Sequence, residues 1–261
     1  MKKMIFTIVS LLAAASVFAQ ADKVIKVGAT PKPHADLLNL VKADLAKQGY
    51  TLEVKEFTDY VQPNVAVQNG ELDANFFQHT PYMENFNKER KFDLVNAGGI
   101  HVEPMGAYSK KIKALKDLKP NAKVAIPNDP TNEGRALLLL QEARLIKLKP
   151  GTGVTATPRD IAENTAKLAF QELEAAQLPR VLADVDLAII NGNYAIDAKL
   201  NIKKDAIIIE GASSPYVNIV AVKKGNEKSP KITALVKALQ SKAVKDYINK
   251  AYADGSVVAV F

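Results

Sequence analysis

The stretch from Phe76 to Tyr82 reads FFQHTPY and combines two phenylalanines, a tyrosine and one of the three histidines of the chain. A histidine in such a group can act as a general base, bind a metal or form the polar edge of an apolar pocket. Catalysis and metal binding both need partner side chains. His34, His79 and His101 are far apart in the sequence, and no H-x-x-x-H, C-x-x-C or G-x-S-x-G pattern occurs. We therefore favour a pocket wall, with no catalytic residue, metal or cofactor.

The two adjacent phenylalanines cannot both face the same layer if this stretch is a strand, because successive side chains point to opposite faces. One ring should enter the core, and the other should lie near the carboxyl end of the strand, where clefts open in α/β folds. Alternation alone does not say which of the two rings enters the core; His79 follows in the loop, and Tyr82 lies one turn into the next predicted helix.

Arg135 could bind a carboxylate. It follows the start of a helix predicted by NDPTNEGRALLLLQ, in which Asp129 can act as the N-cap, Pro130 occupies the first position and Gly134 allows close approach to backbone. Arginine can hold a carboxylate with two N–H donors, which lysine cannot do. The alternative is an exposed arginine that pairs with Asp129 or Glu133.

Two asparagines and a tyrosine lie at other strand ends. Asn191 ends the apolar run DLAII, and Asn218 interrupts the apolar run YVNIVAV. A buried asparagine without partners costs about 1–3 kcal/mol, so each either bridges to backbone or binds a polar ligand. Tyr60 follows the run TLEVKEF, where it either faces a ligand or packs at the loop edge. The loop 28–35, GATPKPHA, is either a plain turn or part of a site for an anionic group.

An α/β framework must position these residues, because short β-branched runs alternate with helical patterns along the chain. Strands are predicted at 24–30, 51–57, 72–77, 122–129, 166–173, 185–192, 205–211 and 216–225. Helices are predicted at 34–49, 61–72, 81–90 and 131–146, with an amphipathic pair at 229–255. We expect two lobes with a ligand cleft between them: lobe I from 22–107 plus 213–261, and lobe II from 108–212.

The first 21 residues have the features of a secretory signal peptide. Lys2 and Lys3 precede an apolar run that ends near Ala15, and small residues allow cleavage after Ala19 or Ala21. We expect export with cleavage at one of these positions; the alternative is retention of the segment as an anchor. No later run of about 18 apolar residues follows, so no further membrane span is expected.

The composition excludes several classes of site. The chain has no cysteine, so it can form neither disulfides nor thiolate zinc sites. Its formal net charge is +7, with two of the positive charges in the signal peptide. The lysines are interleaved with acidic residues and lack the aromatic platforms of a nucleic-acid binder, which indicates a solvated surface and no nucleic-acid partner.

Seven stretches, taken in order, resemble the MetQ/NlpA-type methionine-binding proteins, the substrate-binding components of methionine ABC importers. They are FTDYVQPN, GELDANFFQHTPY, YSKKIKALKDL, VAIPNDPTNEGRALLLLQEARLIKLK, EAAQLPR, AIINGNYA and SPYVNIV. The resemblance implies a two-lobed periplasmic-binding-protein fold, type II-like, that closes on free methionine. It also implies permease and ATPase partners and no enzymatic activity, and we expect a monomer.

The resemblance carries the family's ligand contacts onto seven positions of this chain. The aromatic rings would line a thioether pocket that the histidine shapes, the arginine would pair with the α-carboxylate, and the asparagines would fix the head group. These positions are Tyr60, Phe77, His79, Tyr82, Arg135, Asn191 and Asn218. With Phe77, His79 and Tyr82 on the pocket wall, we expect Phe76 in the core.

One departure from the family concerns the membrane anchor. Members are usually lipoproteins with a cysteine directly after the signal peptide, and this chain has no cysteine. We therefore expect a periplasmic protein without a lipid anchor.

Two alternatives to methionine capture stay open: the same fold binding D-methionine, a methionine-containing dipeptide or another apolar amino acid, or an enzyme on the same fold. An enzyme would need an acid–base pair, for which Glu103 near His101 is the candidate, although Glu103 more simply makes an inter-lobe hydrogen bond.

Overall fold

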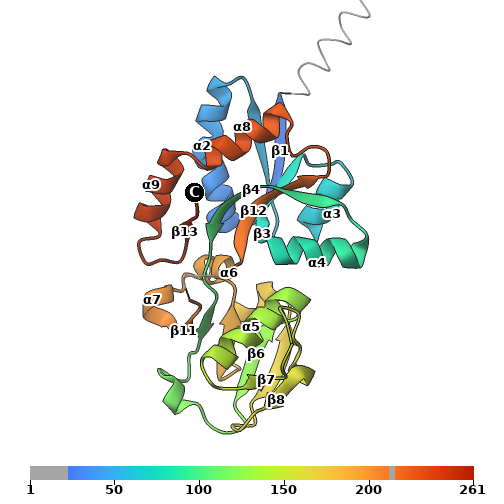
Figure 1. The fold of residues 1–261 in the computed structure, drawn as a ribbon. Coiled ribbons are helices and arrows are strands. Elements are labelled where there is room, and N and C mark those ends of the chain that lie inside the picture. Colours follow the sequence, from blue (N-terminus) through green and yellow to red (C-terminus); the bar gives the residue numbers. More distant parts are fainter. Residues whose placement is uncertain (1–22, 212–214) are drawn as a thin grey trace, which may run out of the picture.

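The computed structural model describes residues 23–211 and 215–261, so the predicted signal peptide at 1–21 lies outside the described residues. Two sheets organise this part of the chain, one above the other in Figure 1. The first has six strands in the order β13-β4-β12-β3-β1-β2, and the second has five in the order β11-β5-β10-β6-β9. Helices pack on both sheets, so the predicted α/β class is confirmed.

The strands of the first sheet come from both ends of the described chain. β1 pairs in parallel with β2 and β3, whereas β12 runs antiparallel between β3 and β4. The strand bounds are β1 Val24–Ala29, β2 Thr51–Glu56, β3 Ala74–His79, β4 Leu94–Val102, β12 Val217–Lys223 and β13 Val258–Ala259.

Helices cover both faces of this sheet. α2, α8 and α9 pack on one face, where α2 buries the predicted apolar stripe of Leu37, Leu38, Val41 and Leu45. α3 and α4 pack on the other face. Successive β12 residues alternate between the two cores, as the pleat of a strand requires. The bounds are η1 Pro31–Ala35, α2 Asp36–Lys47, α3 Gln62–Gln68, α4 Thr80–Arg90, α8 Pro230–Leu239 and α9 Lys242–Ala251.

The second sheet takes all its strands from the middle of the chain. α5 packs on one face, and η4 and α6 pack on the other. The strands are β5 Gly106–Tyr108, β6 Lys123–Pro127, β9 Ala169–Leu173, β10 Leu187–Ile190 and β11 Ala206–Ile209, with a separate hairpin of β7 Lys147–Leu148 and β8 Ile161–Glu163. The helices are η2 Leu115–Asp117, α5 Pro130–Glu142, η3 Pro158–Asp160, η4 Ala175–Val181, α6 Gly192–Asp197 and α7 Ile202–Asp205.

The chain passes between the sheets twice, once between β4 and β5 and once between β11 and β12. β5 begins at Gly106 and already belongs to the second sheet. The lobe boundaries at 107/108 and 212/213 fall close to these crossings and stay a prediction. None of the described helices has both the length and the apolar character needed to cross a bilayer.

Sequence reasoning missed β4, the longest strand of the first sheet. Its sequence, LVNAGGIHV, carries Gly98 and Gly99 and lacks clean alternation, because glycine offers no side chain to mark a face. The structure requires the small residue at Gly98: a Cβ atom there would lie 2.5 Å from a methyl group of Val236 on α8. The feature that hid the strand therefore allows α8 to pack on the sheet.

A Gly134→Ala substitution is expected to destabilise the protein by about 1–3 kcal/mol, the usual cost of overpacking. A Cβ atom at this position in α5 would lie 2.2 Å from the carbonyl oxygen of Val154, and backbone cannot turn aside as a flexible side chain can. Gly153→Ala is the matched control, because nothing lies within 4 Å of its Cβ position. Urea unfolding measures both variants, and equal losses of unfolding free energy would contradict the packing argument.

Candidate ligand-binding site

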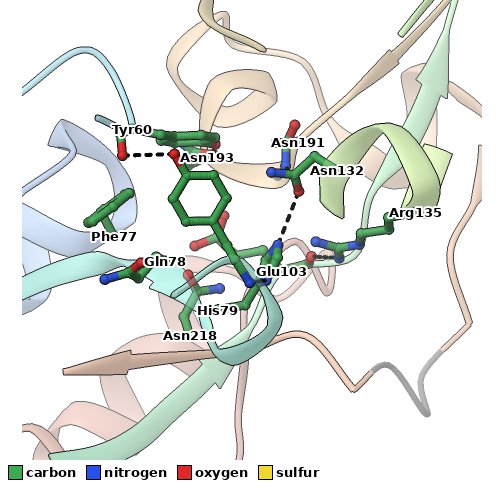
Figure 2. Close-up of a pocket in the computed structure, with 12 residues that line it drawn as sticks. Tyr60, Phe77, Gln78, His79, Glu103, Asn132, Arg135, Asn191, Asn193 and Asn218 are labelled. Atoms are coloured by element: carbon green, nitrogen blue, oxygen red, sulfur yellow. Dashed lines mark hydrogen bonds between the residues drawn. The ribbon is translucent and has the colours of Figure 1, made fainter. Parts of the chain in front are cut away.

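A pocket lies where the two sheets face each other. Its lining comes from the ends of β3 and β10, from α4, α5, α6 and β12, from the loop between β2 and α3, and from the crossing between β4 and β5 (Figure 2). All seven side chains singled out from the sequence lie in this lining, and their role as ligand contacts stays a prediction. The full lining consists of Tyr60, Phe77, Gln78, His79, Tyr82, Glu103, Asn132, Arg135, Asn191, Gly192, Asn193 and Asn218.

One wall of the pocket is aromatic. The ring centroid of Tyr60 lies 5.7 Å from that of Phe77, 5.8 Å from that of Tyr82 and 5.0 Å from that of Tyr194. Phe76 points the other way into the core of the first sheet and is fully buried, so the predicted division of the two phenylalanines is confirmed. The wall can receive a flexible apolar side chain, including one with sulfur.

His79 holds together two sides of the pocket. Its Nδ1 atom accepts a hydrogen bond from the backbone N–H of Tyr82 at 3.2 Å and so caps α4. Nε2 must then carry the ring proton, which it donates to Oδ1 of Asn132 on α5 at 3.1 Å. Burial, followed by the positive charge of Arg135, lowers the pKa of His79 to about 3, so the ring is neutral at physiological pH. His79 therefore positions groups on both sides of the pocket as a neutral donor.

Arg135 is buried at the opposite side, in the second turn of α5. Asp129 caps this helix, as predicted. The predicted alternative for Arg135, exposure and pairing with Asp129 or Glu133, is wrong: its guanidinium binds the carboxylate of Glu210, with Nε 2.8 Å from Oε1 and Nη2 bonded to Oε2. Nη2 also donates to the backbone carbonyl of Glu103 at 2.8 Å.

The crossing regions therefore hold the arginine on two sides. Tyr216, in the second crossing, stacks on the guanidinium, with Cζ of Arg135 4.2 Å from the ring centroid. Glu210 is 75 residues away from Arg135 in the sequence, and no local pattern links the two. Nη1 is the remaining amino group of the guanidinium, and it can donate to a bound carboxylate.

Two asparagine side chains leave buried polar atoms unpaired in this pocket. Nδ2 of Asn191 donates to Oδ1 of Asn132 at 2.8 Å, and Oδ1 of Asn193 accepts from the Tyr60 hydroxyl at 2.6 Å. The other amide atoms, Oδ1 of Asn191 and Nδ2 of Asn193, have no partner among the described residues. A buried unpaired amide group costs about 1–3 kcal/mol, so one free acceptor and one free donor indicate that the pocket takes a ligand with a polar head.

Asn218 serves as a bridge within the protein. It lies on β12 opposite His79 of β3 and His101 of β4, and its Oδ1 lies 3.2 Å from Nε2 of His34. The sequence left open whether this asparagine bridges or binds. The bridge to His34 is present, and the pocket lining also includes Asn218.

Glu103 of the pocket lining and two neighbouring histidines could hold a metal ion. The ligand atoms of His34, His101 and Glu103 lie within 4.8 Å of one another, although the histidines are far apart in the sequence. Nε2 of His101 is hydrogen-bonded to Oε1 of Glu103 at 2.7 Å, and Nε2 of His34, which is hydrogen-bonded to Asn218, lies 3.3 Å from the same oxygen. A metal would have to displace both protons, so the arrangement fits a hydrogen-bonded cluster better than a metal centre.

Three hydrogen bonds connect the two halves of the site. Besides the bonds from Tyr60 to Asn193 and from His79 to Asn132, the hydroxyl of Tyr194 donates to the backbone carbonyl of Thr58 at 3.0 Å. Sequence reasoning did not select Asn132 or Asn193, although both lie inside the quoted motifs NDPTN and IINGNYA. Both could have been selected from the sequence, because each is a polar residue in a motif that already contains a candidate site residue.

Comparison with known proteins gives consistent matches over nearly the whole described chain. A family model described as NlpA lipoprotein matches residues 25–261. The D-methionine-binding lipoprotein MetQ of Yersinia pestis is 46% identical over 221 residues, which cover 83% of this chain and 82% of that protein.

Solved structures agree with this match. A nutrient binding protein from Burkholderia cenocepacia bound to methionine has a TM-score of 0.88 and 51% identity, covering 91% of this chain and 100% of that one. An ABC transporter periplasmic substrate-binding protein from Coxiella burnetii has a TM-score of 0.86 and 46% identity, covering 90% of this chain and 100% of that one. The predicted two-lobed binding-protein fold is therefore confirmed.

Proposed function

The chain belongs to the NlpA lipoprotein family, and we propose on this basis that it captures methionine and delivers it to an ABC importer. The observation that carries this function is the pocket itself. It joins an aromatic wall to a buried arginine and to two unpaired amide atoms. An amino acid with a flexible apolar side chain has the matching halves: an apolar end for the rings and a zwitterionic end for the polar groups.

We propose that the thioether lies against Tyr60, Phe77 and Tyr82, where sulfur–aromatic contacts contribute about 0.3–1.5 kcal/mol each. The α-carboxylate binds Arg135, whose Nη1 group is left over from the pairing with Glu210. Oδ1 of Asn191 and the amide of Asn218 complete the contacts to the head group, and His79 shapes the pocket through its bond to Asn132.

The family consists of substrate-binding and transport proteins, and we propose that this chain acts by binding alone, as a monomer, with a permease and an ATPase as its partners. We place it in the periplasm. The relatives named above include lipoproteins, so they do not support the expectation that this chain lacks a lipid anchor. That expectation rests only on the absence of cysteine from the sequence.

Mass spectrometry of the denatured, freshly purified protein is expected to release methionine. Calorimetric titration of the refolded, ligand-free protein with L-methionine should then give a dissociation constant in the micromolar range or tighter. Parallel titrations with D-methionine, a methionine-containing dipeptide and leucine test the alternatives. If the wild-type protein gives neither heat nor a thermal shift with L-methionine but responds to another of these ligands, that other ligand replaces methionine as the proposed cargo.

A further inference from the structure

Glu103 lines the pocket but has no part in the contacts proposed so far. We propose that its carboxylate binds the α-ammonium group of the ligand, and that His34 and His101 are positioning residues that hold this carboxylate in place. The inference rests on the proposed function, because it names how the same pocket selects a free amino acid.

The charges around the pocket leave Glu103 without a cationic side chain of its own. Among the described residues of the lining, Arg135 and Glu103 are the charged ones, and Arg135 is already paired with Glu210. An amino-acid zwitterion would complete an alternating series: Glu210, Arg135, the ligand carboxylate, the ligand ammonium and Glu103. Such alternation compensates each buried charge by a neighbour of opposite sign.

The two histidines lie against Glu103 without adding positive charge: His101 donates a hydrogen bond to the carboxylate, and Nε2 of His34 lies 3.3 Å from it. Nδ1 of His34 lies 2.7 Å from the Thr30 hydroxyl, and its Nε2 faces two acceptors, Oδ1 of Asn218 and Oε1 of Glu103. Nε2 therefore carries the proton, and Nδ1 accepts from Thr30. Nε2 of His101 faces the carboxylate at 2.7 Å and must likewise be the protonated nitrogen.

Both rings are kept neutral by their surroundings. Burial lowers the pKa of His34 to about 4 and that of His101 to about 3. Nδ1 of His101 is buried and has no partner among the described residues, so a second proton there would be left without an acceptor. Neutral donors orient the Glu103 carboxylate and stabilise its ionised form while leaving its charge available to a ligand cation.

The Glu103 side chain is also contacted by α6, which packs on the second sheet. A Cβ atom at Gly192, the first residue of α6, would lie 2.6 Å from Cβ of Glu103, so α6 begins directly against this side chain. Burial raises the pKa of Glu103, and His34, Arg135 and the backbone N–H of Asn193 offset only part of this rise. The carboxylate is thus held from both halves of the molecule at the pocket surface.

Two ligands separate this role from a general contribution to the pocket. L-Methionine carries the ammonium group, and 4-(methylthio)butanoate is the same molecule without it. Titration of the full protein is expected to show about 100-fold tighter binding of methionine. Glu103→Gln should weaken methionine binding by about 100-fold and change butanoate binding by less than about 3-fold, because the amide keeps the size of the side chain but not its charge.

Variants of His101 test the positioning role. His101→Leu removes one donor to the carboxylate and should weaken methionine binding by about 10-fold, the effect of one hydrogen bond to a charged group, without a matching loss for the butanoate. His101→Gln can place an amide N–H near the Nε2 position and should restore binding to within about 3-fold of wild type.

The possible outcomes are distinct. A wild-type protein that binds neither ligand refutes the proposed function. If wild-type protein binds methionine less than about 10-fold more tightly than the butanoate, the ammonium role of Glu103 is refuted without any variant. Equal losses for both ligands in Glu103→Gln overturn the same inference. Equal losses for both in His101→Leu, with no rescue by His101→Gln, reduce that histidine to a packing role.

Discussion

Arg135→Ala is expected to weaken methionine binding by roughly 2–5 kcal/mol, because truncating one partner of a buried charge pair leaves the other charge without compensation. In the ligand complex this charge is the α-carboxylate, which meets the buried guanidinium in the pocket. Calorimetric titration of the ligand-free variant measures the loss. Arg159→Ala is the control, since this exposed arginine lies outside the pocket. An unchanged affinity would remove Arg135 from the site.

The same substitution leaves the carboxylate of Glu210 without its partner, so the variant also loses stability. A second variant separates the two effects. In Arg135→Ala/Glu210→Gln, the unpaired charge is gone, and the free energy of unfolding should recover while the affinity stays low. If affinity recovers together with stability, the arginine acts only through the fold.

Replacement of the two adjacent phenylalanines by alanine is expected to give different losses. Phe76→Ala should lower the free energy of unfolding by about 3–5 kcal/mol, because the ring is fully buried in the core of the first sheet and its removal leaves a cavity. Phe77→Ala should cost less stability, since its ring borders an existing pocket, but should weaken methionine binding by about 1–3 kcal/mol.

Urea unfolding without ligand and titration with methionine measure both quantities for each variant. Each variant is the matched control of the other, because the same ring is removed from neighbouring positions of one strand. Folded Phe76→Ala protein should bind methionine with an affinity close to that of wild type. Equal stability losses, or a larger affinity loss in Phe76→Ala, would show that the two faces of β3 do not divide between core and pocket.

Much of the framework was predictable because it depends on short-range periodicity. The apolar spacing of Leu37, Leu38, Val41 and Leu45 identified α2 and its buried face. The Asp129 cap and the alternation at Phe76 and Phe77 were local too, and both were confirmed. β4 was not predicted, because its paired glycines serve the packing of α8 rather than the pattern of the strand.

The sequence by itself determined the fold class, the family and seven side chains that gather in one pocket. Only the tertiary structure decided their partners. Glu210 meets Arg135 across 75 residues, and His34 and His101 meet Glu103 where η1 packs near the end of β4. Hydrogen-bond partners, and the protonation states that depend on them, arise from distances between elements brought together by the two crossings of the chain. Neither residue type nor spacing along the sequence encodes those distances directly.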